Sequence, residues 1–546
     1  MSDKNKKLEN QNKQEDKKSI EFCLYDRYLR DKEINSLSKI DFKDIKKLIL
    51  SENKLTNLDF FTKLNLENLN KLKIKDNPIK DINVLEKINL KNLKHLTLYG
   101  TDISDLNALE NANFYDLEKL KICVSKISNI DIFQKVKFKN LKSLIFYGNH
   151  NLKDVNGLIK ANFENLEKLD ISIENSDGDI LTKLNFKNLK KLRISFPKKN
   201  IDISIFQNVK FKNLEILDLS RQENISNINP LEKVEFKNLK LLNLQSNDIS
   251  DVKVLEKVNF KNLEILNLGY NKIENIDILE KVNFPNLKEL DITDIGINNI
   301  NFLLNVNFPK LEKLKIGSNK IRKNINILDK LNFIELRELD IHSIKITDIS
   351  ILEKVKFNKL ESLDLSLNKI NNIDILENVN FKNLKELLLE AMKIKDISFL
   401  AKTDFKFLEK LNLSHNAIKN IDILEKVNFR ELKVLNLDMN HFKDISVLEK
   451  VKFEKLEELS LMESSFANAV VLFKVNFPNL KKLYYGIYPD TDLSGWNPLD
   501  FREEISKKFS LNKNSRLPGD SVSNDDVCED DDNEDDDIEE NDNEDE

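Results

Sequence analysis

Hydrophobic residues recur along this chain at an interval of about 24 residues. Phenylalanine marks the interval most clearly, at Phe114, Phe138, Phe163, Phe186, Phe211, Phe236, Phe260, Phe284, Phe308, Phe333, Phe357, Phe381, Phe405, Phe429, Phe453 and Phe477. Counting back from Phe114 at the same interval reaches Leu90, Leu66 and Phe42. A constant interval of this size indicates stacked supersecondary units rather than one conventional globule.

Each of these anchors is followed by the same spacing of apolar residues. In the repeat that begins at Phe260, Leu266 and Leu268 alternate like strand residues that point to one side. Ile273, Ile276 and Leu279 then follow three residues apart, which is typical of a tight helical or 3₁₀ turn. One repeat therefore predicts one strand and one return segment. Because a single unit of this size cannot bury both of its apolar edges, the units must stack.

This pattern, F-x-x-L-x-x-L-x-L-x-x-N-x-I-x-x-I-x-x-L, resembles the leucine-rich repeat (LRR) family over roughly residues 42–485. It is most similar to the phosphatase-regulatory and internalin-like short-repeat class, although the units here are about two residues longer. The resemblance implies an α/β repeat solenoid, a curved right-handed superhelix. A long parallel β-sheet would line its concave face, and short 3₁₀, helical or irregular segments would form its convex side.

The asparagine of this pattern recurs in nine repeats, at Asn53, Asn77, Asn149, Asn247, Asn271, Asn319, Asn368, Asn416 and Asn440. As in the family, a buried asparagine at this place is expected to hydrogen-bond the turning backbone of neighbouring repeats. Pro197, Ile295, Ile344, Met392 and Tyr488 replace it elsewhere, so the asparagine ladder should be interrupted there.

Both ends of such a stack need a cover, because the terminal repeats would otherwise expose their core. Residues 18–41 are predicted to form a degenerate amino-terminal capping repeat, ahead of a solenoid of about 19 repeats over residues 42–485. Residues 486–511 are predicted to form the carboxyl-terminal cap. There the only tryptophan, Trp496, precedes a short amphipathic helix in which Phe501, Ile505 and Phe509 recur every four residues.

The outermost segments are polar and are predicted to be disordered. Residues 1–17 are rich in Lys, Asn and Gln, and residues 512–546 form a linker and an acidic tail. Sixteen of the 22 residues from 525 to 546 are Asp or Glu, and none is basic. Subtracting these charges from the net charge of −6 leaves +10 for residues 1–524. The tail either only keeps the chain soluble or competes for basic partners such as histones or the chain's own basic surface.

Composition gives no support for an enzyme. Of the five histidines, His95, His342 and His415 lie near the concave side, but they are thirteen repeats apart at the extremes, too far for one active site. The sequence contains neither a P-loop nor a glycine-rich dinucleotide turn. Cys23, Cys123 and Cys528 are too scattered for a disulfide framework or a paired zinc site. No cofactor, metal or small-molecule substrate is therefore predicted. Without a membrane span, a signal peptide or cysteine-rich caps, the chain is expected to be cytoplasmic, with the nucleus as an alternative.

The predicted concave face carries the more specific signal. If Leu266 and Leu268 point into the core, the residues five, seven and nine places after each anchor point to the concave side. In the repeats from Phe42 to Phe186, nine of these positions are Lys or Arg and one, Asp170, is acidic. In the repeats from Phe211 to Phe477, ten are acidic and four are lysines. The predicted face is therefore basic toward the amino end and acidic toward the carboxyl end.

These positions, with the aromatic residues beside them, are the predicted partner-binding residues. The basic set is Lys71, Lys73, Lys75, Tyr99, Lys119, Lys121, Tyr147, Lys191 and Arg193. The acidic set, with the tyrosine near the change of sign, is Tyr270, Asp291, Glu338, Asp340, Asp364, Glu386 and Glu390. The simplest alternative is that the charges only solubilise a sheet that no helix covers.

Three functions remain open at this stage. The first is a non-enzymatic scaffold or adaptor that binds a partner protein of unknown identity on the concave face. The second is a nuclear protein that binds histones or other basic proteins, because repeats followed by an acidic tail resemble the acidic nuclear LRR phosphoproteins. The third is a phosphatase regulatory subunit, which only the resemblance of the repeats suggests. The acidic tail argues against nucleic acid, whose phosphates it would repel.

Overall fold

The structure, a computed structural model, describes residues 20–509 except 26–28, 35–36, 38, 153, 174–177, 197–201, 223, 323 and 489–490. The predicted disordered segments, 1–17 and 512–546, lie outside the described residues, as do the outer ends of both predicted caps. The chain divides into two compact units. The first unit is Met1–Leu242 with Val258–Phe260, and the second is Asn243–Lys257 with Lys261–Glu546.

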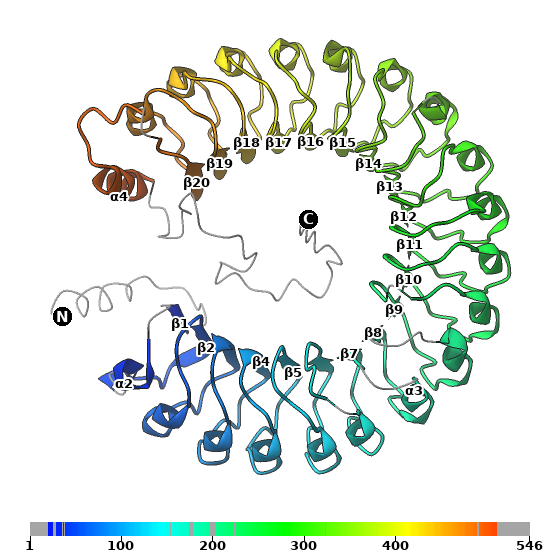
Figure 1. Cartoon of the computed structure of the whole chain (residues 1–546), viewed down its shortest axis with the longest axis vertical. Coiled ribbons are helices and arrows are strands. Elements are labelled where there is room, and N and C mark those ends of the chain that lie inside the picture. Colours follow the sequence, from blue (N-terminus) through cyan, green and yellow to red (C-terminus); the bar gives the residue numbers. More distant parts are fainter. Residues whose placement is uncertain are drawn as a thin grey trace. The chain divides into compact units, whose positions relative to one another are not determined.

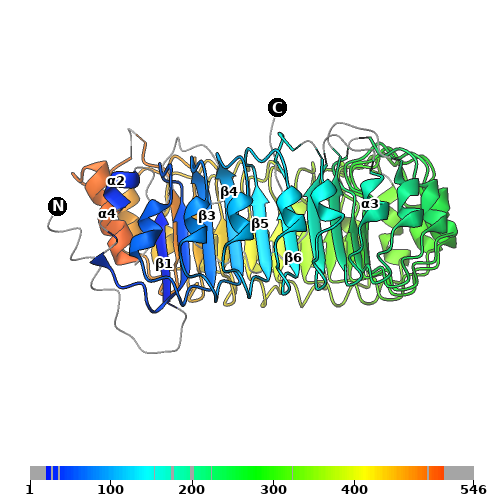
Figure 2. The same ribbon diagram turned by 90° about the horizontal axis from the view of Figure 1, so that it is seen from below.

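The first unit contains a ladder of parallel strands, each hydrogen-bonded to the next along the chain (Figures 1 and 2). The strands are β1 (Ile20–Tyr25), β2 (Ile45–Ser51), β3 (Lys71–Asn77), β4 (His95–Thr101), β5 (Lys119–Cys123), β6 (Ser143–Phe146), β7 (Lys168–Ser172), β8 (Lys191–Ser195) and β9 (Ile216–Asp218). Strand β10 (Leu241–Asn243) contains the boundary between the units.

The second unit repeats this arrangement with shorter strands, most of them three residues long. They are β11 (Ile265–Asn267), β12 (Glu289–Asp291), β13 (Lys313–Lys315), β14 (Glu338–Asp340), β15 (Ser362–Asp364), β16 (Glu386–Leu388), β17 (Lys410–Asn412), β18 (Val434–Asn436), β19 (Glu458–Leu461) and β20 (Lys482–Tyr485). Each pairs in parallel with the next, and every leucine at the strand centre faces the leucine of the neighbouring repeat.

The return segments are mostly 3₁₀ helices, as the three-residue spacing predicts. The first unit has α2 (Asp31–Ile34), η2 (Asp59–Lys63), η3 (Asn83–Glu86), η4 (Asn107–Glu110), η5 (Asp131–Gln134), η6 (Asn156–Leu158), α3 (Ile180–Lys183), η7 (Ile203–Asn208) and η8 (Asn229–Lys233). The second has η9 (Lys253–Glu256), η10 (Ile276–Lys281), η11 (Asn301–Leu304), η12 (Asn324–Lys330), η13 (Ser350–Glu353), η14 (Ile373–Glu377), η15 (Ser398–Ala401), η16 (Asp422–Glu425), η17 (Ser446–Glu449), η18 (Ala469–Phe473) and α4 (Pro498–Lys508). Within each unit the strands line the inner side and these helices the outer side (Figure 1).

The phenylalanine anchors are buried in every repeat that has one, so they form a spine inside the stack. In the first unit, the ring centroids of Phe138 and Phe163 lie 6.3 Å apart at an interplanar angle of 10°, and those of Phe163 and Phe186 are also 6.3 Å apart. From Phe114 to Phe186, each ring therefore packs on the ring of the next repeat. Burying a side chain of this size stabilises the fold by roughly 1.5–3 kcal/mol, so the spine is a major part of the core.

The asparagine ladder is also confirmed, because all nine predicted asparagines are buried. Asn271 shows the geometry: its side-chain nitrogen donates to the carbonyl oxygens of Leu244 and Leu268, both at 2.9 Å. Its side-chain oxygen accepts from the amide of Ile249 at 3.0 Å. One amide side chain thus satisfies buried backbone groups of its own repeat and of the preceding one, which ties the two repeats together.

The asparagine ladder is interrupted in repeats where the sequence has another residue at this position. In some of these repeats, neighbouring residues form hydrogen bonds in place of the missing asparagine. Pro197 lies outside the described residues. The amides of Ile295 and Met392 donate to the asparagine oxygens of the following repeats, at 3.2 and 3.0 Å. Gln222, which the pattern did not single out, takes the asparagine's place: it accepts from the amide of Phe196 at 2.8 Å and donates to Ile194 O at 2.9 Å. A longer amide can therefore serve the same turn.

The predicted terminal helix is present as α4, and it packs on the last repeat. Phe501 and Ile505 are fully buried, and the ring of Phe501 lies 4.9 Å from that of Phe473. Asn497 caps the helix by accepting from the amide of Leu499 at 2.8 Å. Trp496 is partly exposed, with its ring 5.6 Å from that of Phe473. These contacts cover the apolar end of the last described repeat.

The residue just before the asparagine position adopts a left-handed backbone conformation in most repeats, as at Glu52, Asp76, Ser246 and Met439. This conformation turns the chain toward the buried asparagine, or its substitute, one residue later. Val124 occupies the position with φ of 50°. A β-branched residue pays the largest steric cost there, because its Cβ and the following carbonyl come too close.

We expect Val124→Gly to stabilise the first unit by up to about 1 kcal/mol, because relief of the left-handed strain exceeds the added entropy of the unfolded chain. The side chain is 44% exposed, so little burial is lost. Chemical denaturation followed by circular dichroism measures the change. Ser128→Gly is the control, since Ser128 is exposed and has no positive φ. A loss of stability in Val124→Gly as large as in Ser128→Gly would contradict the strain argument.

Candidate functional site

The strand residues alternate between the core and the inner face, as the pattern predicts. Leu266 and Leu268 are fully buried, whereas Ile265 and Asn267, on either side of Leu266, are partly exposed. Register is kept between repeats: Ile265 pairs with Glu289 and Asn267 with Asp291. The inner-face residues of successive repeats therefore stand in columns, about 4.8 Å apart along the ladder.

The inner face of the first unit carries a basic ladder. We use this name for the predicted basic set, Lys71, Lys73, Lys75, Tyr99, Lys119, Lys121, Tyr147, Lys191 and Arg193. The first column runs from Lys71 through His95, Lys119, Ser143 and Lys168 to Lys191. The second runs from Lys73 through Thr97, Lys121, Ile145 and Asp170 to Arg193. The structure thus aligns the predicted basic residues on one face of one unit.

Tyrosine rings separate the lysines of the basic ladder. The ammonium of Lys75 lies 5.6 Å from the centroid of the Tyr99 ring, and that of Lys121 lies 5.9 Å from the same ring. Lys121 also lies 5.9 Å from the ring of Tyr147. Cation–π attraction at these distances holds the lysines beside the rings, and the rings limit their movement. The sequence placed both tyrosines near this face, but it did not show that Lys121 lies between them.

Asp170 is the acidic group within the basic ladder. Burial raises the pKa of its carboxyl to about 6, and this effect exceeds the opposing charges of Arg193, Lys168 and Lys121. Arg193 is shared with a second carboxylate, since its Nε lies 3.6 Å from Asp218 Oδ2. As pH falls through about 6, protonation of Asp170 therefore makes this face more positive.

The second unit carries an acidic ladder, made of Asp291, Glu338, Asp340, Asp364, Glu386 and Glu390. Asp340 pairs in register with Asp364, and Glu386 lies on the next strand, β16. Burial raises the pKa of Asp364 to about 6, with the nearby Asp340 charge acting in the same direction. Asp291 is almost fully buried, and burial also raises its pKa.

Several charges of the acidic ladder are already paired with the lysines of the same columns. Lys313 lies between Glu289 and Glu338, at 3.7 and 3.4 Å, and Lys315 contacts the same two carboxylates at 3.7 Å. Lys410 lies 2.8 Å from Glu386. The sequence count of ten acids against four lysines contained no information on this pairing. Less negative charge is therefore offered to a partner than the sequence alone indicates.

Some of the acidic residues also have a local structural role that the sequence reasoning missed. The side-chain oxygen of Asp291 accepts from the amide of Thr293 at 2.9 Å, and that of Asp364 accepts from Ser366 at 2.8 Å. Asn267 makes the same turn with Gly269 at 2.9 Å. Because the side chain takes an amide two residues ahead, the strand pairing stops early. This explains why most strands of the second unit are shorter than β2, β3 and β4 of the first.

Tyr270 lies at the edge of the acidic ladder rather than on a strand. It follows β11, has φ of 54° and is 46% exposed. Burial of its hydroxyl raises its pKa, and the charges of Asp291, Asp294 and Asp340 add to the rise. The predicted residue is therefore close to the acidic ladder, in the turn beyond it.

A family model described as "Leucine Rich repeats (2 copies)" matches residues 237–281 and 406–450. The same strand, asparagine and 3₁₀ register continues through the repeats on both sides of these segments. The chain is a leucine-rich repeat protein. No curated protein sequence matches this LRR chain at a significant level.

Solved structures similar to this LRR chain come from distant proteins. An internalin of Listeria monocytogenes is 24% identical, covers 73% of this chain and 88% of its own, and has a TM-score of 0.34. An LRR protein of Leptospira interrogans is 20% identical over 79% of this chain and 99% of its own, with a TM-score of 0.43. Mouse RP105, in its complex with MD-1, is 19% identical over 82% and 83%, with a TM-score of 0.49.

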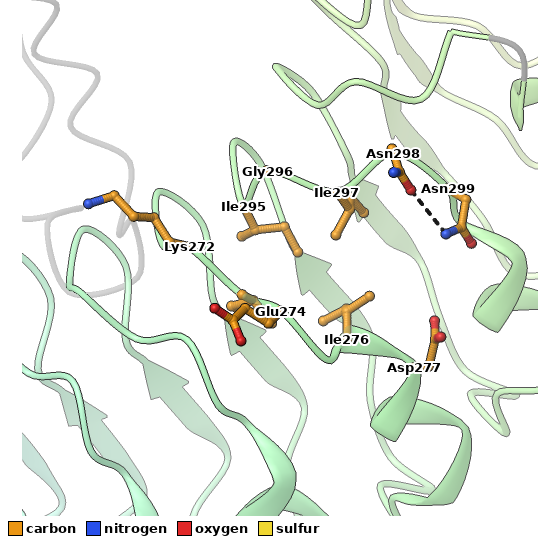
Figure 3. A pocket seen from close by; sticks show the side chains of 10 residues that line it. Lys272, Glu274, Ile276, Asp277, Ile295, Gly296, Ile297, Asn298 and Asn299 are labelled. Carbon is orange, nitrogen blue, oxygen red and sulfur yellow. Dashed lines mark hydrogen bonds between the residues drawn. The ribbon is translucent and has the colours of Figure 1, made fainter.

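Outside the two ladders, we considered a hollow in the second unit, the two described cysteines and the described helices. A hollow of about 500 Å³ in the second unit lies between the turns that follow β11 and β12 (Figure 3). The buried Ile276, Ile295 and Ile297 line it, together with Asn298 and Asn299, and the side-chain nitrogen of Asn299 donates to Asn298 at 3.3 Å. Both cysteines in the described residues are free thiols, and burial raises the pKa of Cys123 to about 12. Among the described helices, none has the length and apolar character needed to cross a lipid bilayer.

Proposed function

We propose that this LRR chain is a non-enzymatic scaffold that binds a partner protein through its strand face. The observation that supports this most is the basic ladder, in which successive cation–π contacts link Lys75, Tyr99, Lys121 and Tyr147. Tyrosine is a favoured anchor of protein interfaces because it buries a large area at low entropy cost. An acidic segment of a partner would complement the ammonium groups between the rings.

The acidic ladder of the second unit would bind basic groups of the same or another partner. Glu390 and Asp364 are partly exposed there, and no ion pair found in the described residues engages Asp364 with a lysine or arginine. Carboxylates that remain without a lysine or arginine in this way favour contact with cationic side chains. The LRR fold itself is used mainly for protein binding, which agrees with this assignment.

The proposal is tested by reversing the charges of the basic ladder. In the variant Lys71→Glu, Lys73→Glu, Lys119→Glu and Lys121→Glu, we expect at least a 10-fold loss of affinity for a labelled polyglutamate peptide, measured by fluorescence anisotropy. Affinity capture of partners from a cell lysate should fall in parallel. Because Lys71 and Lys73 are mostly buried, Lys121→Glu alone serves as a milder variant, and circular dichroism checks folding.

The matched control reverses the same number of charges outside the strands of the same unit. Lys80, Lys87, Lys137 and Lys139 are exposed and lie outside the strands, and their reversal to Glu should leave binding unchanged. Equal losses in the two variants would show that only net charge matters, and the proposal would then be wrong.

Residues 525–546 support the second candidate, a protein that binds histones or other basic proteins, because this segment carries 16 acidic residues and no basic ones. A chain that ends at residue 524 separates the two candidates in the same assay. A scaffold that uses the basic ladder keeps its partner, whereas histone binding through the tail is lost.

A further inference from the structure

Three potential metal ligands meet on adjacent strands of the second unit, within the acidic ladder. Asp340 ends β14, His342 follows it by two residues, and Asp364 ends β15 beside Asp340. Each residue offers one ligand atom, and these three atoms all lie within 4.8 Å of one another. None of the three side chains is fully exposed, so the group lies against the protein rather than free in solvent.

The imidazole of His342 is held in one orientation by the preceding repeat. Its Nε2 lies 3.0 Å from Ser318 Oγ, and its Nδ1 lies 2.7 Å from Asp340 Oδ1. Gly317 makes room for the ring, because a Cβ on Gly317 would come within 2.2 Å of Nδ1. A ring fixed through one nitrogen, with the other directed at a carboxylate, is the arrangement in which an outer contact orients a histidine ligand.

Two carboxylates flank the imidazole of His342. Asp340 Oδ1 contacts Nδ1, and Asp364 lies beside Asp340 in register on the next strand. The lysines of the same columns, Lys313 and Lys315, contact Glu289 and Glu338.

We propose that Asp340, His342 and Asp364 form a binding site for one divalent transition-metal ion, with Zn²⁺ as the best match. One imidazole nitrogen and two carboxylate oxygens suit Zn²⁺, which binds such atoms at about 2.0–2.2 Å. Binding requires the imidazole to lose its Nδ1 proton and the Nδ1 to Asp340 hydrogen bond to open slightly around the ion. Ser318 keeps its contact with Nε2 and orients the ring. The remaining coordination positions belong to water.

The test uses the full chain without a histidine tag, because a tag would bind the same metals. Zn²⁺ is titrated by calorimetry in excess Mg²⁺, which occupies the acidic run of residues 525–546 without competing for an imidazole. We expect one Zn²⁺ per chain, and at least 10-fold weaker binding in His342→Ala and in Asp364→Asn. Co²⁺ should give visible d–d absorption bands in the wild-type chain that disappear in His342→Ala.

His441→Ala is the control, since His441 lies in the second unit and is exposed to solvent, but belongs to no such group among the described residues. It should bind Zn²⁺ as the wild-type chain does. Asp364→Asn keeps an oxygen that can accept from the amide of Ser366, so this variant should remain folded. Equal Zn²⁺ affinity in the wild type and His342→Ala, or no binding in excess Mg²⁺, would overturn the proposal. Neither outcome bears on the basic ladder, which is tested separately.

Discussion

Replacing Asn319 with alanine is expected to lower the free energy of unfolding of the second unit by about 3–5 kcal/mol. Its side-chain nitrogen donates to the carbonyl oxygens of Ile292 and Ile316, at 2.8 and 3.1 Å. Its side-chain oxygen accepts from the amides of Ile295 and Ile297, both at 3.2 Å. Asn319 is 1% exposed, so no water replaces these bonds when the amide is removed. Each buried backbone group left without a partner costs about 1–3 kcal/mol.

Hydrogen exchange locates this loss, because stability in a stack of repeats is local as well as global. The amides of Ile295 and Ile297 should exchange much faster in Asn319→Ala, and chemical denaturation should show the lower stability. Asn298→Ala is the control: Asn298 is exposed, and its removal should change stability by less than about 0.5 kcal/mol. If the two variants were equally stable, the buried asparagines would not join the repeats as the structure indicates.

Phe501→Ala is the second substitution for which we expect a large effect. It should weaken the packing of α4 on the last described repeat by about 3–5 kcal/mol. The ring is fully buried and contacts both Phe473, at 4.9 Å, and Tyr485, at 6.4 Å between centroids. Its loss leaves a cavity at the end of the last described repeat and weakens the cover of the core. Because the helix contacts only this end of the stack, α4 should detach before the rest of the second unit unfolds.

Trp496 reports this event directly, since it is the only tryptophan and its ring lies 5.6 Å from Phe473. In Phe501→Ala, the tryptophan emission should change at a lower denaturant concentration than the circular dichroism of the strands. Leu499→Ala on the same helix is the control, because Leu499 is 74% exposed and its removal should have little effect. A single coincident transition at the wild-type midpoint would contradict a separate role for α4.

Most of the repeat architecture could be predicted from the sequence because its physical signals are local and repeated. The spacing after each anchor fixes which leucines enter the core, and the buried Leu266 and Leu268 agree with it. The three-residue spacing of Ile273, Ile276 and Leu279 predicts the return segment that becomes η10. The asparagine column predicts the buried amides, as Asn271 shows. Each of these features depends on contacts within one repeat or with the next.

The candidate sites could be predicted only in outline. The sequence placed Lys121 on the inner face, but not between Tyr99 and Tyr147, which depends on side-chain rotamers. It counted Lys313 only as one of four lysines against ten acids, whereas the structure shows two glutamates of neighbouring strands in contact with it. Likewise, His342 and Asp364 belong to different repeats, and only the structure brings them to one place.

The sequence by itself determined the repeat, the side of each strand that faces the core and the side that lies on the inner face of each unit. These follow from the periodicity of two in a strand and from the need to bury every anchor ring. The tertiary structure alone decided which charges neutralise each other, which side chains end the strands and where the two units divide. Those outcomes depend on distances, desolvation and rotamers between residues of different repeats, and such differences do not appear in the order of residue types.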